Sequence, residues 1–149
     1  MSSEHVLFIV KPEGLPYRDL IATTIEAAGL PIILRQPLVL TANLVMGLYP
    51  CLKGPLIDTT FWWLANKTCE VGLVVAPNAI VRLLELCGAN PNPVLCGLNT
   101  IRRRYGNTEP LYLSYCGQKF EYYFNVVHCA RTAEQAAHDL ALLKPALAP

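Results

Sequence analysis

Apolar runs of strand length alternate along this chain with amphipathic stretches, a pattern that predicts alternating strands and helices. The continuous apolar run His5–Val10 predicts a buried strand. An amphipathic stretch over Asp19–Ala28 predicts a helix, and Gly29 is well suited to end it. Leu30–Leu40 predicts a second strand, which is bent or lies at an edge because its two prolines cannot donate to a ladder.

The middle of the chain predicts further elements of the same two kinds. In chain order they are a short helix from its cap Thr41 to Leu48, one or two helical turns over Phe61–Asn66, a strand over Val71–Ala76, a helix from Asn78 through Leu86 closed by Gly88, a loop over 89–99 rich in proline and asparagine, and a helical piece over Thr100–Arg104.

The last third of the chain predicts a hairpin, a strand and a helix. Two aromatic runs flank Cys116-Gly117-Gln118, which predicts a β-hairpin near 111–124. Aromatic and β-branched residues over Phe120–Val127 predict a strand, and a capping box of Thr132 and Gln135 opens a helix through Leu143. The order β-α-β-β-α-β predicts an α/β (α+β) ferredoxin-like fold, an antiparallel four-stranded sheet with helices packed on it and this hairpin inserted.

Composition narrows the class of protein. A length of 149 residues predicts one domain over 1–149. The hydrophobic fraction of 53% against 15% charged residues predicts an oligomer interface, and a net charge of +1 gives no electrostatic case for binding nucleic acid or an anionic membrane. We expect no signal peptide, because the apolar run Val6–Val10 is too short for one and Glu4 precedes it. We also expect no membrane span, because charged residues, prolines and an asparagine interrupt every long apolar stretch. Six cysteines without C-x-x-C spacing predict free thiols in the cytoplasm or another reducing compartment, and no zinc site.

Two residues at opposite ends of the chain are candidates for chemistry. His128 lies between an apolar run and a helix start, so rigid elements would hold it on both sides. That placement suits a nucleophile, although on its own it is more typical of an ordinary surface histidine. Lys11 closes the first strand before a turn, which would put an ammonium at the edge of the sheet, where it can bind phosphate.

The segments around these residues resemble motifs of the nucleoside diphosphate kinase family. Lys11-Pro12-Glu13-Gly14 is similar to the family's Lys-Pro-Asp-Gly, and Asn125-Val126-Val127-His128 is similar to its Asn-x-x-His. Three more similarities lie between them in the family's order, at Leu48-Tyr49, Asn92-Pro93 and Thr100-Ile101-Arg102. The resemblance covers nearly the whole chain and implies the same ferredoxin-like fold.

The resemblance also implies a function. It implies a phosphotransferase that moves the γ-phosphate of a nucleoside triphosphate to a nucleoside diphosphate through a phosphohistidine at His128. Mg²⁺ would be held mainly by the nucleotide phosphates, and the protein would be a homo-oligomer, a hexamer or tetramer, or a subunit of a larger assembly. Besides His128, the implied site residues are Asp139 as support for the imidazole, Lys11 and Arg102 for phosphate, Asn125 for the sugar, Tyr49 and Phe61 as cleft aromatics, and Asn90 for the family's loop threonine.

Several positions depart from the family pattern. Leu84 stands where the family has an arginine, and Arg82, the nearest substitute, would point around the other side of its helix. Cys129 and Ala130 replace the glycine and serine after the histidine, and 106–124 is longer than the family's connection. One lost charge-stabilising donor costs about 10²–10³ in rate. The alternative is therefore a catalytically weak or inactive subunit with a nucleotide-binding, regulatory or structural assembly role.

Three other interpretations concern the same residues. A ferredoxin-like RNA-binding module needs aromatic residues on a basic sheet face, against which the neutral charge argues. The aromatics of the hairpin are typical of base stacking and also of packing on the body or on a neighbouring subunit. A cysteine hydrolase could use Cys129 or Cys116, but the adjacent His128 and Cys129 would point to opposite sides of a strand.

Overall fold

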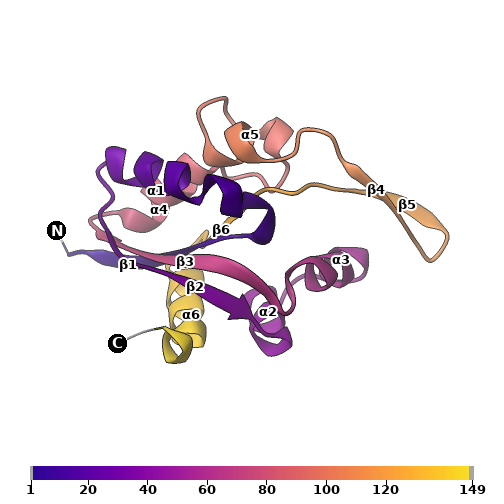
Figure 1. Cartoon of the computed structure of the whole chain (residues 1–149), viewed down its shortest axis with the longest axis horizontal. Coiled ribbons are helices and arrows are strands. Elements are labelled where there is room, and N and C mark those ends of the chain that lie inside the picture. The colour runs from indigo at the N-terminus through magenta and orange to yellow at the C-terminus, as the bar shows by residue number, and fades with distance from the viewer. Residues whose placement is uncertain (1, 148–149) are drawn as a thin grey trace.

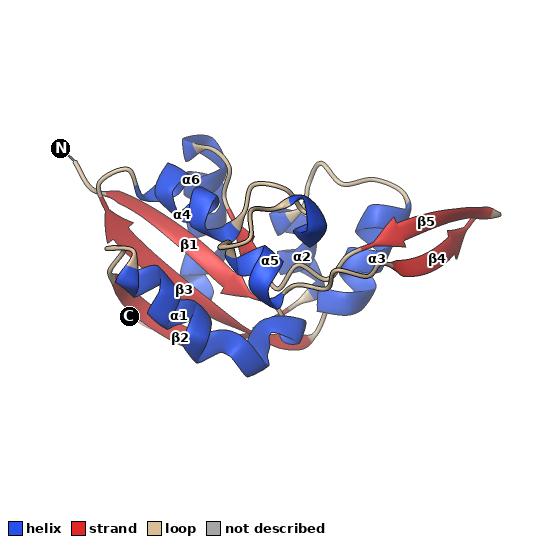
Figure 2. Cartoon of the chain, turned by 90° about the horizontal axis from the view of Figure 1, so that it is seen from above, coloured by secondary structure: helices blue, strands red, loops and turns tan. Residues whose placement is uncertain are grey.

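The computed structural model describes residues 2–147, so Met1 and positions 148–149 of the expected domain lie outside the described part. Four strands form one antiparallel sheet in the order β2-β3-β1-β6 (Figures 1 and 2). Their bounds are β1 Glu4–Val10, β2 Ile32–Leu40, β3 Lys67–Ala76 and β6 Val127–Cys129. The central strand β1 pairs with the last strand β6, which brings both candidate motifs to one end of the sheet.

Helices cover both faces of this sheet. In Figure 1, α1 and α4 lie on one side, and α2 and α6 lie on the other. The α-helices are α1 Arg18–Ala27, α2 Ala42–Leu48, α3 Pro55–Leu64, α4 Ala79–Cys87, α5 Ile101–Tyr105 and α6 Ala133–Leu143, with 3₁₀ turns at Pro12–Tyr17, Pro93–Leu95 and Lys144–Ala146. The predicted βαββαβ ferredoxin-like fold is confirmed.

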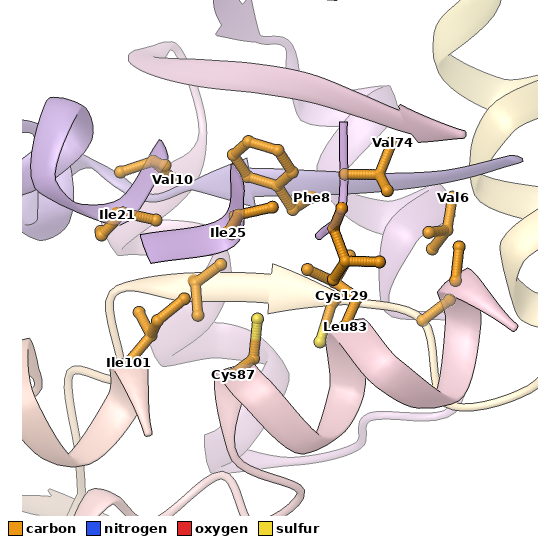
Figure 3. Close-up of a cluster of buried hydrophobic side chains, with 14 of the residues drawn as sticks. Val6, Phe8, Val10, Ile21, Ile25, Val74, Leu83, Cys87, Ile101 and Cys129 are labelled. Atoms are coloured by element: carbon orange, nitrogen blue, oxygen red, sulfur yellow. The ribbon is translucent and has the colours of Figure 1, made fainter. Parts of the chain in front are cut away.

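Alternate residues of β1 build two separate cores. Val6 and Phe8 point into the first core, between the sheet and helices α1 and α4 (Figure 3). Leu7 and Ile9 point into the second core, with residues of α2, α3 and α6. Burial on both faces explains why β1 is a continuous apolar run rather than an alternating one.

A hairpin extends from the body beyond the sheet (Figures 1 and 2). Its strands, β4 Leu111–Tyr115 and β5 Gln118–Tyr122, pair only with each other among the described residues. Both central turn residues have positive φ, 49° at Cys116 and 77° at Gly117, as a tight two-residue hairpin turn requires. The predicted hairpin is confirmed.

Three of the predicted elements have wrong boundaries. The strand expected over Val71–Ala76 is β3, which begins earlier, at Lys67. Phe120–Val127 is not one strand, because β5 ends at Tyr122 and β6 begins at Val127. The intervening chain leaves the hairpin and turns at Val126, whose φ of 62° breaks an extended conformation. The helix expected over Phe61–Asn66 is α3, which begins earlier at Pro55, a residue whose fixed φ suits the first helical turn.

Candidate active site

The turn after β1 and the segment before His128 form a single structure. The backbone N–H of Lys11 donates to the carbonyl of Val126 over 2.8 Å, and the N–H of Val126 donates to the Glu13 carboxylate over 3.3 Å. A Cβ on Gly14 would stand 2.7 Å from the Val126 carbonyl oxygen, so glycine is required for this close approach. The turn thereby holds a β-branched residue in a left-handed conformation that costs about 1–3 kcal/mol.

The turn after β1 and the segment before His128 together line one side of a cavity of about 370 Å³. Five of the eight site residues predicted from the sequence line it: Lys11, Tyr49, Arg102, Asn125 and His128. They come from α5, β6 and the segments next to β1, α2 and β6, which are separated in sequence and meet at this end of the sheet.

His128 is held by an aspartate from the last helix. Its Nε2 lies 2.9 Å from Oδ2 of Asp139, and both residues are buried. A carboxylate can only accept from the ring, so Nε2 carries the proton and Nδ1 remains as the basic nitrogen. The side chain of Asp139 thus reaches the ring, as expected for a residue that supports the imidazole. Burial lowers the pKa of His128 and outweighs the opposite effect of Asp139, so the imidazole is neutral at pH 7.

Lys11 is the buried cation beside this imidazole. Its Nζ donates to Oδ1 of Asn125 over 2.7 Å, and Nδ2 of Asn125 donates to the carbonyl of Pro91 over 3.0 Å. The ammonium also lies 5.8 Å from the ring centroid of Tyr49, whose ring meets that of His128 edge to face. Desolvation by burial lowers the pKa of Lys11 to about 8, against the raising effect of Glu13.

Arg102 adds a second buried positive charge. Its Nη1 donates to the carbonyl of Gly88 over 2.8 Å and its Nη2 donates to the carbonyl of Val127 over 2.9 Å. Arg102 is buried, whereas its neighbour Arg104 is exposed, so the arginine run is not a uniformly solvated face. The two carbonyls fix the guanidinium at the wall of the cavity.

Apart from Asp139, which contacts the imidazole, two of the predicted site residues do not line the cavity. Phe61 packs against the second core, and its neighbour Thr60 lines the cavity instead. The side-chain oxygen of Asn90 accepts from the backbone N–H of Asn92 over 2.9 Å, and Asn92 is the one that faces the cavity. In each case a residue one or two positions away in the chain lines the cavity instead.

The start of the last helix contributes residues that sequence reasoning missed. Arg131 and Gln135 both line the cavity. The N–H of Gln135 donates to the Thr132 hydroxyl over 3.1 Å, which is the first half of the predicted capping box. The side chain of Gln135 accepts from the N–H of Arg131 over 2.9 Å, one residue before the cap, so the reciprocal half is shifted by one position. The sequence contained a signal for Arg131, because this residue directly precedes Thr132, which caps the predicted helix. Arg82, by contrast, donates to carbonyls of Pro77, Ala28 and Gly29.

The base of the hairpin closes one side of the cavity. Glu121, Tyr122 and Tyr123, which we call the hairpin wall, all line it. The Tyr122 hydroxyl lies 3.1 Å from the hydroxyl of Thr60 on α3. Immediately after the wall, the ring of Phe124 contacts that of Trp63 with centroids 4.7 Å apart. Through these contacts the base of the hairpin packs against α3.

Two features are absent from residues 2–147: a helix suited to cross a membrane and a cluster of metal-ligating side chains. No helix in this part of the chain has the length and apolar character that crossing a membrane requires. The same residues contain no group of three or more histidine, cysteine, aspartate or glutamate side chains suited to hold a metal ion.

Fold and cavity together define a ferredoxin-like α/β protein in which a buried histidine, lysine and arginine meet at one pocket. The family model for nucleoside diphosphate kinase matches residues 4–146. The chain therefore belongs to the nucleoside diphosphate kinase family.

Solved structures of the family share this fold. A nucleoside diphosphate kinase from Borrelia burgdorferi, a transition-state mimic with vanadate and ADP, superposes with a TM-score of 0.78 at 19% identity, covering 94% of this chain and 86% of that one. A family protein from Babesia bovis gives 0.76 at 23% identity, with 98% and 93% covered. The kinase from Aquifex aeolicus gives 0.73 at 17% identity, with 95% of both chains covered. No match was found among the curated proteins.

Proposed function

We propose that this protein is a nucleoside diphosphate kinase-like phosphotransferase that moves the γ-phosphate of a nucleoside triphosphate to a nucleoside diphosphate through a phosphohistidine at His128. The observation that carries the proposal is the arrangement of His128 in the cavity. Asp139 binds Nε2 at 2.9 Å, which leaves Nδ1 as the nucleophile, and Lys11 lines the same cavity.

The reaction takes place in two halves. Nδ1 attacks the γ-phosphorus, the bond from that phosphorus to the β,γ-bridging oxygen breaks, and the diphosphate leaves with the bonding electrons. A second diphosphate then attacks the phosphohistidine through a terminal oxygen, and the N–P bond breaks to restore neutral His128. Mg²⁺ enters as part of the nucleotide substrate, since this ion prefers phosphate and water oxygens to an all-protein cage.

The chain's own residues supply position and charge. Lys11 and Arg102 place two cations at the cavity, where they stabilise negative charge on the transferring phosphoryl group. Asn125 orients the Lys11 ammonium through its side-chain oxygen. Asp139 holds the ring and stabilises the positive charge that His128 acquires as its Nδ1 bonds to phosphorus.

Arg131 supplies the positive charge that Leu84 cannot. Leu84 packs against the first core, so helix α4 contributes no guanidinium at that position. Arg131 reaches the cavity from the segment that joins His128 to α6. The family arginine is thus replaced by a residue from a different element.

Labelling with γ-³²P nucleoside triphosphate and Mg²⁺ tests the proposal. We expect label on the protein that is lost in acid and kept in base, as for phosphohistidine, and no such label on a His128→Ala variant. His138→Ala is the matched control, because His138 is exposed and its ring nitrogen bonds the carbonyl of Gly47, away from the cavity lining. Equal label on His128→Ala and wild type, with both folded by circular dichroism, would overturn the assignment.

A catalytically weak, nucleotide-binding subunit is the second candidate. It is favoured by Leu84, which packs against the first core where the resemblance implies an arginine. It is also favoured by the contact between Tyr122 and Thr60, which ties the hairpin wall to α3 at the cavity. Calorimetry separates the two candidates: tight nucleotide binding by a protein that takes up no label supports the subunit.

A homo-oligomer, a hexamer or tetramer, is also part of the proposal. Large apolar side chains are more than half exposed in the single chain, among them Leu98, Leu95, Tyr112, Trp62 and Ile33. An oligomer interface would cover such residues. Light scattering tests this, and a mass near 16.5 kDa at micromolar concentration would contradict it.

A further inference from the structure

Two cysteines meet behind the candidate active site. Cys129 follows His128 in β6 and packs into the first core. Cys87 is the last residue of α4, which packs against β6, and its side chain is directed toward Cys129 (Figure 3). Both side chains belong to the first core, and the interaction between the two thiols raises the pKa of Cys87 and lowers that of Cys129.

The two cysteines differ in access and in surrounding charge. Cys129 lines the cavity and is 4% exposed, whereas Cys87 has no exposed surface. The interaction with Cys87 and the positive charges of Arg102, Arg131 and Lys11 lower the pKa of Cys129. Together they outweigh its burial, which raises that pKa. Cys129 is therefore set to react first with a small molecule in the cavity, and Cys87 to react second.

We propose that Cys129 is a hydroperoxide-reactive thiol and that Cys87 resolves it into an intramolecular disulfide. The thiolate of Cys129 attacks one peroxide oxygen, the O–O bond breaks, and the departing hydroxide or alkoxide takes up a proton. Cys129 is then a sulfenic acid. The sulfur of Cys87 attacks it, the S–O bond breaks, and the leaving hydroxide takes the Cys87 proton to form water. Two thiols are oxidised to a disulfide and one peroxide is reduced to water and water or alcohol.

Mass mapping of a protein with fewer surface thiols tests this. Cys51 and Cys116 are exposed, so both are changed to serine to give a background protein. This protein is treated with hydrogen peroxide, denatured, alkylated and digested without reductant. We expect a mass lower by two hydrogens, two fewer alkylated thiols and a peptide pair linked through Cys87 and Cys129. The linkage should disappear on treatment with a dithiol reductant.

Cys69 is the internal control for a buried thiol outside this pair. Burial raises the pKa of Cys69 to about 12, so this thiol should remain fully alkylated. Oxidation spread equally over Cys69 and the pair, or a pair that stays reduced, would overturn the proposal. Because the mapping requires no change in the core, its result stands even if core variants misfold.

Single substitutions in the background protein fix the order of events. With Cys87→Ser, a 1,3-dione probe should trap sulfenic acid at Cys129; with Cys129→Ser, Cys87 should not react. Trapping at Cys87 in place of Cys129 would refute the assigned order. These readouts are independent of phosphoryl transfer, so the disulfide can be established or refuted whatever the outcome for the proposed function.

Discussion

The buried floor of the cavity and its hairpin wall are held by different kinds of contact. In the floor, Lys11, Asn125, His128 and Asp139 are all buried and form two short hydrogen-bonded pairs. The hairpin wall is attached by one tyrosine hydroxyl and a following aromatic contact, and the strands beyond it pair only with each other in the described chain. The floor should therefore be sensitive to substitution, whereas the hairpin wall should tolerate it.

The largest effect is expected from the carboxylate that fixes the imidazole. Asp139→Asn keeps size but loses the charge that selects the Nε2–H tautomer, so label uptake by His128 should slow by about 10²–10⁴-fold. Rapid-quench labelling measures this. Asp139→Glu should largely restore the rate, and Asp58→Asn, which changes a carboxylate on α3 outside the cavity lining, should leave it unchanged. A normal rate with asparagine would show that the tautomer is set by something else.

The next effect concerns the guanidinium contributed by the helix start. Arg131→Ala should lower phosphoryl transfer by about 10²–10³-fold, the usual worth of one charge-stabilising donor, with little change in stability because Arg131 is exposed. Arg104→Ala removes an exposed arginine whose guanidinium lies against Tyr105 and is the control. Equal losses in both variants would mean that general charge, rather than position, matters.

A third effect is a dependence on pH that comes from the floor alone. Because the pKa of Lys11 is lowered to about 8, its ammonium is lost as pH rises through that value, and nucleotide affinity should fall by up to about tenfold per pH unit. The unfolded chain keeps this proton up to about pH 10.5, so the free energy of unfolding contributed by Lys11 rises with pH between these values.

Titrations of binding and of labelling check this pH dependence. Lys11→Arg stays charged and should give a flat binding curve above pH 8. The lowered pKa of His128 places the acid limb of labelling below pH 6.5. An acid limb above that value would contradict the burial of the imidazole.

The smallest effect is expected at the hairpin wall. Tyr122→Phe removes the bridge to Thr60, a hydrogen bond worth about 0.5–1.5 kcal/mol, so nucleotide affinity should change by at most about tenfold and the labelling rate at saturation should not change. Calorimetry measures the nucleotide affinity, and labelling at saturating nucleotide measures the rate. A large loss of rate would place the hairpin wall in the chemistry and erase the contrast with the floor.

Lys11, Asn125 and His128, which the structure brings together at the cavity, belong to short motifs that are visible in the sequence. Lys11, Arg102 and His128 lie in or next to regular elements. Strand alternation predicted that Cys129 points away from His128; Cys129 packs into the first core but also lines the cavity with His128. Positions further from these motifs were less accurate: Phe61 and Asn90 are displaced from the cavity by one or two residues. Sequence periodicity does not indicate which of several neighbouring residues in a short helix or loop faces the cavity.

The hairpin explains the largest error in the fold. The run Phe120–Val127 has strand composition throughout, but its first part pairs with β4 and its last residue pairs with β1. The change of partner falls in between, where Val126 takes a positive φ that a valine rarely adopts. The tertiary contacts of Glu13 and Gly14 stabilise that conformation, and local propensity does not report them.

The pairing of Lys11 with Asn125 has a consequence for how the protein is made. These residues are 114 positions apart, so the cavity cannot form until almost the whole chain has left the ribosome and the last strand has docked on the first. Contacts of such long range are closed late in folding, because the entropy of loop closure must be overcome first. Nucleotide binding should therefore appear only with the completed fold, and a nascent or partly folded chain would carry the lysine motif without any affinity for its ligand.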